Sequence, residues 1–312
     1  MSEFNYGGQA VIEGVMMRGA KYVAVAVRNP AGEIIIHDEP LNARIYGGRI
    51  SKLPFLRGTV MLWDALVLGM RALLFSADVA LEEEEEVEFK GPIAWGSVAF
   101  SLVIGIGVFL LGPLFLVRLV DRYIASSLVS NILEGLVRLA FFLVYVYAIG
   151  FIPDIRRVFA YHGAEHKTIN AYEDGATLKP DAVQAYSTAH PRCGTGFLLI
   201  FAVIAIFVFS LLGRPSLVLR IISRVVLIPV IAGLTYELIK FSAAHRDNPL
   251  ISTVVLAPSL ALQRLTTREP DESMLEVAIA ALQRLLDMEE EGVGKTRSDH
   301  QIARELGVEY DL

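Results

Sequence analysis

Hydrophobic positions gather in long runs separated by short charged segments. Residues 91–117 and 193–213 contain no charged side chain, while residues 128–153 and 217–239 are apolar with few charges. Each run is about as long as the roughly 20 residues that a helix needs to cross the hydrocarbon core of a bilayer. The pattern therefore predicts a mainly α-helical integral membrane protein with about four transmembrane helices.

The charges inside two of these runs can be accommodated. Glu134 and Arg138 stand four residues apart and can pair on one helix face. Arg220 and Arg224 lie near one end of the last run, where long side chains can snorkel toward water, and Pro229 predicts a kink.

The N-terminal part has the alternation and turn residues of β structure. Tyr22–Arg28 is rich in valine, Asn29–Gly32 has the residues of a type I turn, and Glu33–His37 continues as a second strand. Gln9–Met17 is predicted to add a third strand. Residues 1–58 are thus expected to form a small β-rich unit.

The segment before the first span differs from the spans. Phe55–Ala80 has helical character but is interrupted by Asp64 and Arg71, which favours a helix at the membrane surface. Six glutamates between Glu82 and Glu88 follow, and such a run of like charges indicates a solvated linker.

The C-terminal part is expected outside the hydrocarbon core. Leu250–Leu262 is apolar but too short to cross, which favours an interfacial segment. After Asp271 leucines and isoleucines recur at helical spacing, which predicts an amphipathic helix followed from Glu289 by a polar tail. The predicted division is 1–58 (β unit), 59–90 (interfacial helix and acidic linker), 91–153 (spans one and two), 154–192 (polar segment), 193–240 (spans three and four) and 241–312 (interfacial segment, amphipathic helix and tail).

Composition narrows the class of protein further. The net charge of −6 is accounted for by the glutamate run, so no basic excess suggests a nucleic-acid partner. A single cysteine, Cys193, rules out an intrachain disulfide and fits a reducing compartment. The N-terminus lacks the pattern of a cleaved signal peptide, so we expect internal helices to direct insertion.

Four spans place both termini on the same side of the membrane as residues 154–192. That segment carries Arg156, Arg157, Lys167, Lys179 and Arg192. Because Lys and Arg near span ends favour the cytoplasmic side, both termini are predicted to be cytoplasmic. The prediction is a multi-pass protein of the inner (plasma) membrane.

The candidate chemistry lies in the sequence from Tyr161 to Lys167. On a helix, His162 and His166 stand one turn apart and can bind one divalent metal, with zinc the expected ion. Glu165 lies beside them and can accept a proton from a metal-bound water. This is the H-x-x-E-H arrangement of the inverzincin metallopeptidases.

Two histidines leave a catalytic zinc site incomplete, since such sites take three protein ligands. The candidates are His190 and Cys193, just before the third span, and Glu237 near the end of the fourth. Cys193 precedes a helix start, where the positive end of the dipole favours a thiolate. Placing a carboxylate near a membrane boundary costs free energy unless it is paired or binds a metal, so the position of Glu237 makes it a candidate third ligand. His245 is a weaker one.

Each of these residues also has a purely structural interpretation. The two histidines can serve as hydrogen-bonding residues at the interface, and Cys193 can be an inert small hydrophobe. Glu237 can pair with Lys240, three residues further along the helix.

Four segments together resemble one family. Gly7–Gly19, Tyr161–Lys167, His190–Thr195 and Gln263–Pro270 are similar to the bacterial YqhQ-like integral membrane family, and the resemblance extends from about Gly7 to Leu286. It implies a domain of unknown function that is labelled a predicted metal-dependent enzyme.

Two functions of different classes follow. The first is a membrane-embedded, zinc-dependent hydrolase at the cytoplasmic face, with Glu165 as general base and a peptide or lipid-linked substrate. The second is a non-enzymatic membrane scaffold or assembly factor that contacts another membrane protein, with a structural metal or none. A transporter is disfavoured because spans one and three lack charged residues. A di-iron membrane oxygenase is rejected, because resemblance to that enzyme family would imply about eight histidines and the chain has six.

Overall fold

The computed structural model describes residues 6–41, 53, 55–80, 92–213, 215–245 and 248–305. The acidic run and residues 306–312 lie outside these ranges. In chain order the elements are β1 (Gly7–Val11), β2 (Gly14–Arg18), β3 (Tyr22–Arg28), β4 (Ile34–Pro40), α2 (Leu56–Ala80), α3 (Pro92–Ile106), a π-helical segment (Gly107–Leu111), α4 (Gly112–Asp121), α5 (Ser127–Ile149), α6 (Pro153–Glu173), α7 (Pro180–Val183), α8 (Gly194–Ser210), α9 (Leu217–Val226), α10 (Ile228–Ala244), α11 (Pro249–Ile251), a second π-helical segment (Ser252–Leu256), α12 (Ala257–Thr266) and α13 (Glu272–Glu305).

The four strands form one antiparallel sheet in the order β1-β2-β3-β4. The predicted hairpin of β3 and β4 is confirmed: the N–H of Gly32 donates to the carbonyl of Asn29 at 2.9 Å, and Gly32 adopts a φ of +89°. The single strand predicted over Gln9–Met17 is wrong. It folds into β1 and β2 around Ile12 and Glu13, because Glu13 adopts a φ of +50° and closes a tight turn.

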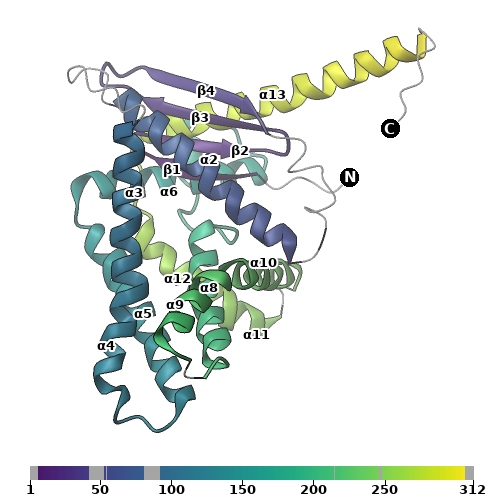
Figure 1. Ribbon diagram of the computed structural model, residues 1–312. Helices are drawn as coiled ribbons and strands as arrows, with labels where there is room; N and C mark the ends of the chain where they lie inside the picture. The colour runs from purple at the N-terminus through teal and green to yellow at the C-terminus, as the bar shows by residue number, and fades with distance from the viewer. Residues whose placement is uncertain are drawn as a thin grey trace.

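Helices cover both faces of this sheet (Figure 1). On one face Val15 and Met17 join a buried cluster with residues of α6 and α13. On the other face Met16 and Val25 join a second cluster with residues of α2. Because neighbouring strand positions point to opposite faces, β2 and β3 are buried on both faces, whereas β4 is half-buried or exposed.

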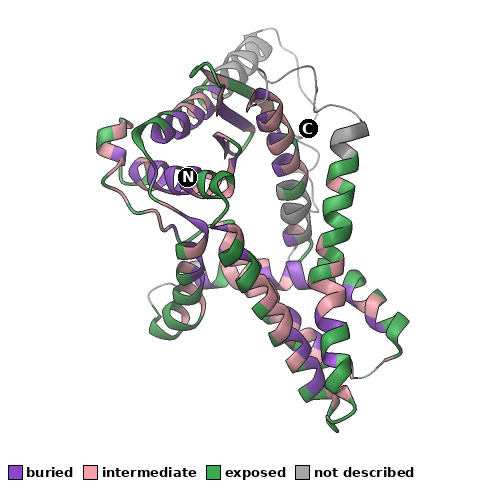
Figure 2. Ribbon diagram, turned by 90° about the vertical axis from the view of Figure 1, so that its left-hand side faces the viewer, coloured by how far each residue is buried: buried purple, intermediate pink, exposed green. Residues whose placement is uncertain are grey.

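The predicted amphipathic helix is present as α13 and supplies much of this core. Leu275 and Leu282 are fully buried, Ile279 is nearly so, and Leu286 is partly buried against them. The helix continues to Glu305, past the position where the polar tail was predicted to start. Figure 2 shows the buried positions gathered where α6 and α13 meet the sheet.

Helix α2 is confirmed as a helix, and its contacts account for its apolar face. Leu68, Ala72 and Val79 belong to the cluster under the sheet. Near its start, a Cβ placed on Gly58 would meet the Cβ of Tyr236 at 2.7 Å, so α2 crosses α10 very closely. Its predicted position at the membrane surface stays a prediction.

Two helical segments are long and apolar enough to cross a membrane: Gly96–Asp121, with 26 residues, and Ser127–Ile149, with 23. The pair Leu217–Val226 and Ile228–Ser242, bent by 44°, makes a third span if it is counted as one. By length and composition, the described residues thus contain two spans, or three with the bent pair, and four are not shown. Helix α8, at 17 residues, is shorter than a typical span.

The core that α13 shares with the sheet can be tested by truncating one side chain. Leu282→Ala removes a fully buried side chain and should cost about 2–5 kcal/mol, because the packed neighbours cannot fill the cavity. We expect a clear fall in the melting temperature of the detergent-solubilised protein, measured by circular dichroism. Leu286→Ala, on the half-buried side of the same helix, is the matched control and should cause a smaller fall. Equal effects would contradict this assignment of the core.

Candidate metal centre

Helix α6 carries the histidine motif, as the spacing predicts. It begins with Pro153 at its first position and runs for 21 residues across the sheet. His162 and His166 project from the same side, with ring centroids 4.4 Å apart. Residues one turn apart on a helix share a face, so the local fold alone brings the two imidazoles together.

Backbone carbonyls fix the tautomer of both rings. Nδ1 of His162 lies 2.9 Å from the carbonyl oxygen of Thr266, and Nδ1 of His166 lies 2.6 Å from that of Thr188. A carbonyl oxygen can only accept, so each Nδ1 donates its proton. In the neutral imidazole the other nitrogen, Nε2, then carries a free lone pair. Metal-binding histidines are oriented by hydrogen bonds of this kind.

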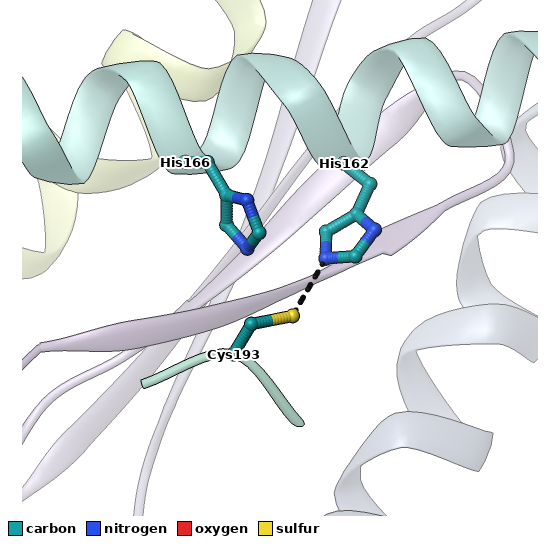
Figure 3. A group of neighbouring side chains, drawn as sticks. All are labelled: His162, His166 and Cys193. Atoms are coloured by element: carbon teal, nitrogen blue, oxygen red, sulfur yellow. Dashed lines mark hydrogen bonds between the residues drawn. The ribbon is translucent and has the colours of Figure 1, made fainter. Parts of the chain in front are cut away.

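Cys193 brings its sulfur to the same place from another element. It caps the N-terminus of α8, and Sγ accepts a hydrogen bond from the backbone N–H of Thr195 at 3.4 Å. Sγ lies 3.2 Å from Nε2 of His162, as the dashed line in Figure 3 shows. The positive end of the α8 dipole favours negative charge on this sulfur.

The three ligand atoms lie within 4.8 Å of one another, and no other group of His, Cys, Asp or Glu among the described residues meets this criterion. Zinc–nitrogen and zinc–sulfur bonds of about 2.0 and 2.3 Å put tetrahedral ligands roughly 3.3–3.6 Å apart. The 3.2 Å between Nε2 of His162 and Sγ of Cys193 is close to this spacing, and the three residues together form a group that could hold a metal ion. Three protein ligands would leave a fourth position for water or substrate.

Glu165 lies buried next to this group, only 4% exposed. One carboxylate oxygen is 3.4 Å from Nε2 of His166, and the backbone N–H of Gly8 in β1 donates to the carboxylate. Burial raises the pKa of Glu165 to about 7, although His162 and the Gly8 hydrogen bond act in the opposite direction. The carboxyl group of Glu165 therefore lies beside the candidate ligand atoms, with a pKa near neutral.

The structure places His190 beside the group but outside it. Its ring centroid is 5.7 Å from that of His166, and Nε2 is buried with no hydrogen-bond partner among the described residues. Burial lowers the pKa of His190 to about 4. Gln263 holds the backbone of His190 through both its N–H and its carbonyl, at 2.9 and 2.8 Å. His190 is thus a neighbour of the three ligand atoms.

Glu237 is not brought to the histidines. Its two carboxylate oxygens accept from Nε and the terminal nitrogen of Arg57 at 2.7 and 2.5 Å, and the N–H of Phe55 adds a third hydrogen bond. Glu237 thus pairs with Arg57 in place of the predicted Lys240. This bidentate ion pair joins the start of α2 to α10. The carboxylate is thereby satisfied without a metal.

Several residues around the centre cannot be identified from side-chain chemistry alone. Thr188 and Thr266 act through backbone carbonyls, and Gly8 acts through its N–H. Gly8 must be glycine, because a Cβ there would meet Cγ of Glu165 at 2.8 Å and the carbonyl oxygen of Met16 at 2.6 Å. The sequence offered one signal for Gly8, its place in the Gly7–Gly19 segment, but it could not show that Gly8 contacts Glu165, 157 residues further along the chain.

The fold is mainly helical, with a small antiparallel sheet and two or three candidate spans. Its candidate site is a histidine–cysteine group in which His166 is buried and His162 and Cys193 are half-buried. Residues 53–288 match the family described as Protein of unknown function (DUF1385). The chain is 35% identical over 310 residues to the Uncharacterized protein YqhQ of Bacillus subtilis (strain 168), an alignment that covers 95% of this chain and 97% of the relative. The chain therefore belongs to the DUF1385 family, which confirms the YqhQ-like resemblance. No solved structure matches it.

The close approach of α6 to the segment that orients His162 gives a second prediction. A Cβ on Gly163 would lie 2.1 Å from the carbonyl oxygen of Arg268, so Gly163→Ala must push that backbone away from α6. Overpacking of this kind costs typically 1–3 kcal/mol, and we expect a lower melting temperature. Gly194→Ala, next to Cys193, adds a Cβ with nothing within 4 Å and should leave the melting temperature unchanged. A stable Gly163→Ala protein would argue against this packing.

Proposed function

We propose that this chain is a membrane-embedded, zinc-dependent hydrolase. The proposal rests on the convergence of three atoms: Nε2 of His162, Nε2 of His166 and Sγ of Cys193. A backbone carbonyl orients each imidazole, and the backbone N–H of Thr195 donates to the sulfur. Catalytic zinc takes three protein ligands and keeps one position for water or substrate. His162, His166 and Cys193 supply such a set, and Glu165 supplies a carboxylate beside it.

In the proposed reaction each residue has one task. His162, His166 and Cys193 would hold the zinc ion, which would supply a water nucleophile near neutral pH. Glu165 would take the proton of that water and pass it to the leaving group of a carbonyl or phosphoryl substrate. The N–H of Gly8 holds the carboxylate in place. The carbonyls of Thr188 and Thr266 hold the imidazole rings.

The position of the centre supports a substrate at the membrane boundary. Cys193 lies where the apolar helix α8 begins, and α6 follows three residues after the end of α5. We therefore propose a peptide or lipid-linked substrate that reaches the centre from the membrane surface. The basic residues of the 154–192 segment support an inner-membrane protein in which the centre and both termini are on the cytoplasmic side.

One observation favours the second function, a scaffold or assembly factor. Nε2 of His162 lies within hydrogen-bond distance of Sγ of Cys193, and the Nδ1 atoms of both histidines are paired with carbonyls. The group is thus largely satisfied by its own contacts. It can hold α6, α8 and α12 together with a structural metal or with none.

The metal content of the purified protein tests the ligand set. The full-length chain, purified in detergent without chelators, should carry about one zinc ion per chain by inductively coupled plasma mass spectrometry. The His162→Ala, His166→Ala double variant should lose most of it. His245→Ala removes an exposed histidine whose Nδ1 lies 2.9 Å from the carbonyl oxygen of Phe241 in the same helix, and should keep the metal. Full zinc occupancy in the double variant would rule out this site.

Glu165→Gln separates the enzyme from the scaffold. The substitution keeps the shape of the side chain but removes its ability to accept a proton, and general-base catalysis is typically worth 10²–10⁴-fold. The variant should keep its zinc and its melting temperature, yet fail to restore the phenotype of a strain that lacks the gene. Glu33→Gln, an exposed glutamate in the β3–β4 hairpin, should restore it. Normal complementation by a zinc-loaded Glu165→Gln protein would favour the scaffold.

A further inference from the structure

Helix α9 is amphipathic in the opposite sense to a helix of a water-soluble protein. Its apolar residues Val218 and Val226 are 65% and 64% exposed, whereas Arg220 and Arg224 are buried. The two arginines thus point into the bundle and do not snorkel toward water as predicted. An exposed apolar face with charges turned inward is the arrangement of a helix surrounded by lipid.

The buried arginines surround one carboxylate of α5. Glu134 is 1% exposed and accepts hydrogen bonds from Arg224 at 3.0 and 3.2 Å. It also accepts from Arg138 at 2.8 Å, as the spacing of four residues predicts. Arg220 stands further off, with a terminal nitrogen 3.9 Å from Glu134.

These four side chains carry more positive than negative charge. Three guanidinium groups face a single carboxylate, so the cluster has a net charge of plus two in a segment with little access to water. The ring of Phe209, 4.0 Å from the guanidinium carbon of Arg224, offsets part of the cost. Nε of Arg220 is nevertheless buried without a hydrogen-bond partner among the described residues. A buried donor left unpaired costs free energy, and excess buried charge costs more.

The turn from α4 to α5, where α5 begins, lies at the end of the bundle away from the sheet (Figure 1). Glu134 is seven residues from the start of α5, or about 10 Å along its axis. Next to it, Asn131 donates to the carbonyl of Gly213, in the connection that leads to α9.

We propose that this cluster, formed by Glu134, Arg138, Arg220 and Arg224, binds a phosphate group, either of an anionic lipid headgroup or of free phosphate. Guanidinium groups match phosphate oxygens in geometry and form charge-assisted hydrogen bonds with them. A bound phosphate supplies the missing negative charge and an acceptor for Nε of Arg220. The cluster is built from α5 and α9 and shares no residue with the candidate metal centre, so the site does not depend on that centre.

Lipid binding to the delipidated, detergent-purified protein tests the site. The probes are dioleoylphosphatidylglycerol, dioleoylphosphatidylcholine and inorganic phosphate, with affinities from native mass spectrometry and melting temperatures. Phosphatidylglycerol should bind more tightly than phosphatidylcholine, because the excess charge favours a net anionic headgroup. Stabilisation by inorganic phosphate without a preference for phosphatidylglycerol would identify free phosphate as the ligand.

Variants of opposite sign make the test specific. Arg220→Gln should weaken phosphatidylglycerol binding about fivefold, the effect of one basic side chain near an anionic surface. Glu134→Gln should strengthen it, because it removes the competing carboxylate. Arg122→Gln, an exposed arginine at the same end of the bundle, should leave it unchanged. If Arg220→Gln fails to fold, the phosphatidylglycerol affinity of Glu134→Gln relative to the wild type tests the proposal.

Two results would overturn the proposal. The first is equal affinity for the two lipids together with no effect of inorganic phosphate. The second is an affinity for the bound probe that neither Arg220→Gln nor Glu134→Gln changes. Either result would show that the cluster is an internal ion pair that only joins α5 to α9.

Discussion

The hydrogen bonds from Nδ1 of His162 and His166 to two backbone carbonyls are the constraint on which the proposed chemistry depends. They leave Nε2 of each neutral ring as an acceptor that faces Cys193. In the other tautomer Nε2 would carry the proton and could not bind a cation. The carbonyls belong to Thr266, at the end of α12, and Thr188, in the connection before α8. The chemistry of the centre is therefore determined by how these segments pack on α6.

The sheet fixes α6 from the other side. The tight turn at Glu13 presents a carboxylate that accepts two hydrogen bonds from Arg157, both at 2.6 Å, and one from Tyr161. Gly8 in the neighbouring strand reaches the carboxylate of Glu165. The positive φ of Glu13 is strained for a non-glycine residue, and these contacts explain why it persists. The N-terminal hairpin thus orients the helix that carries the candidate site.

Much of this could be predicted from the sequence, because the signals are local. Helical spacing placed His162 and His166 on one face, and turn residues indicated the β3–β4 hairpin. Contacts between distant segments could not be predicted in the same way. Glu237 forms its ion pair with Arg57 and not with Lys240. The histidines bond the backbone carbonyls of Thr188 and Thr266, which any residue type could supply. The structure shows two or three of the four predicted spans, since hydropathy alone does not reveal that α8 has only 17 residues or that α9 and α10 meet at a bend of 44°.

The central claim is that one metal ion is held by two histidine nitrogens and the sulfur of Cys193. X-ray absorption spectroscopy at the zinc edge of the detergent-purified protein tests it most directly. The account predicts one sulfur at about 2.3 Å and two imidazole nitrogens at about 2.0 Å, with a further light atom at the open position. The sulfur shell should disappear in Cys193→Ser. A zinc signal without sulfur in the wild-type protein, or a sulfur shell that persists in Cys193→Ser, would contradict the account.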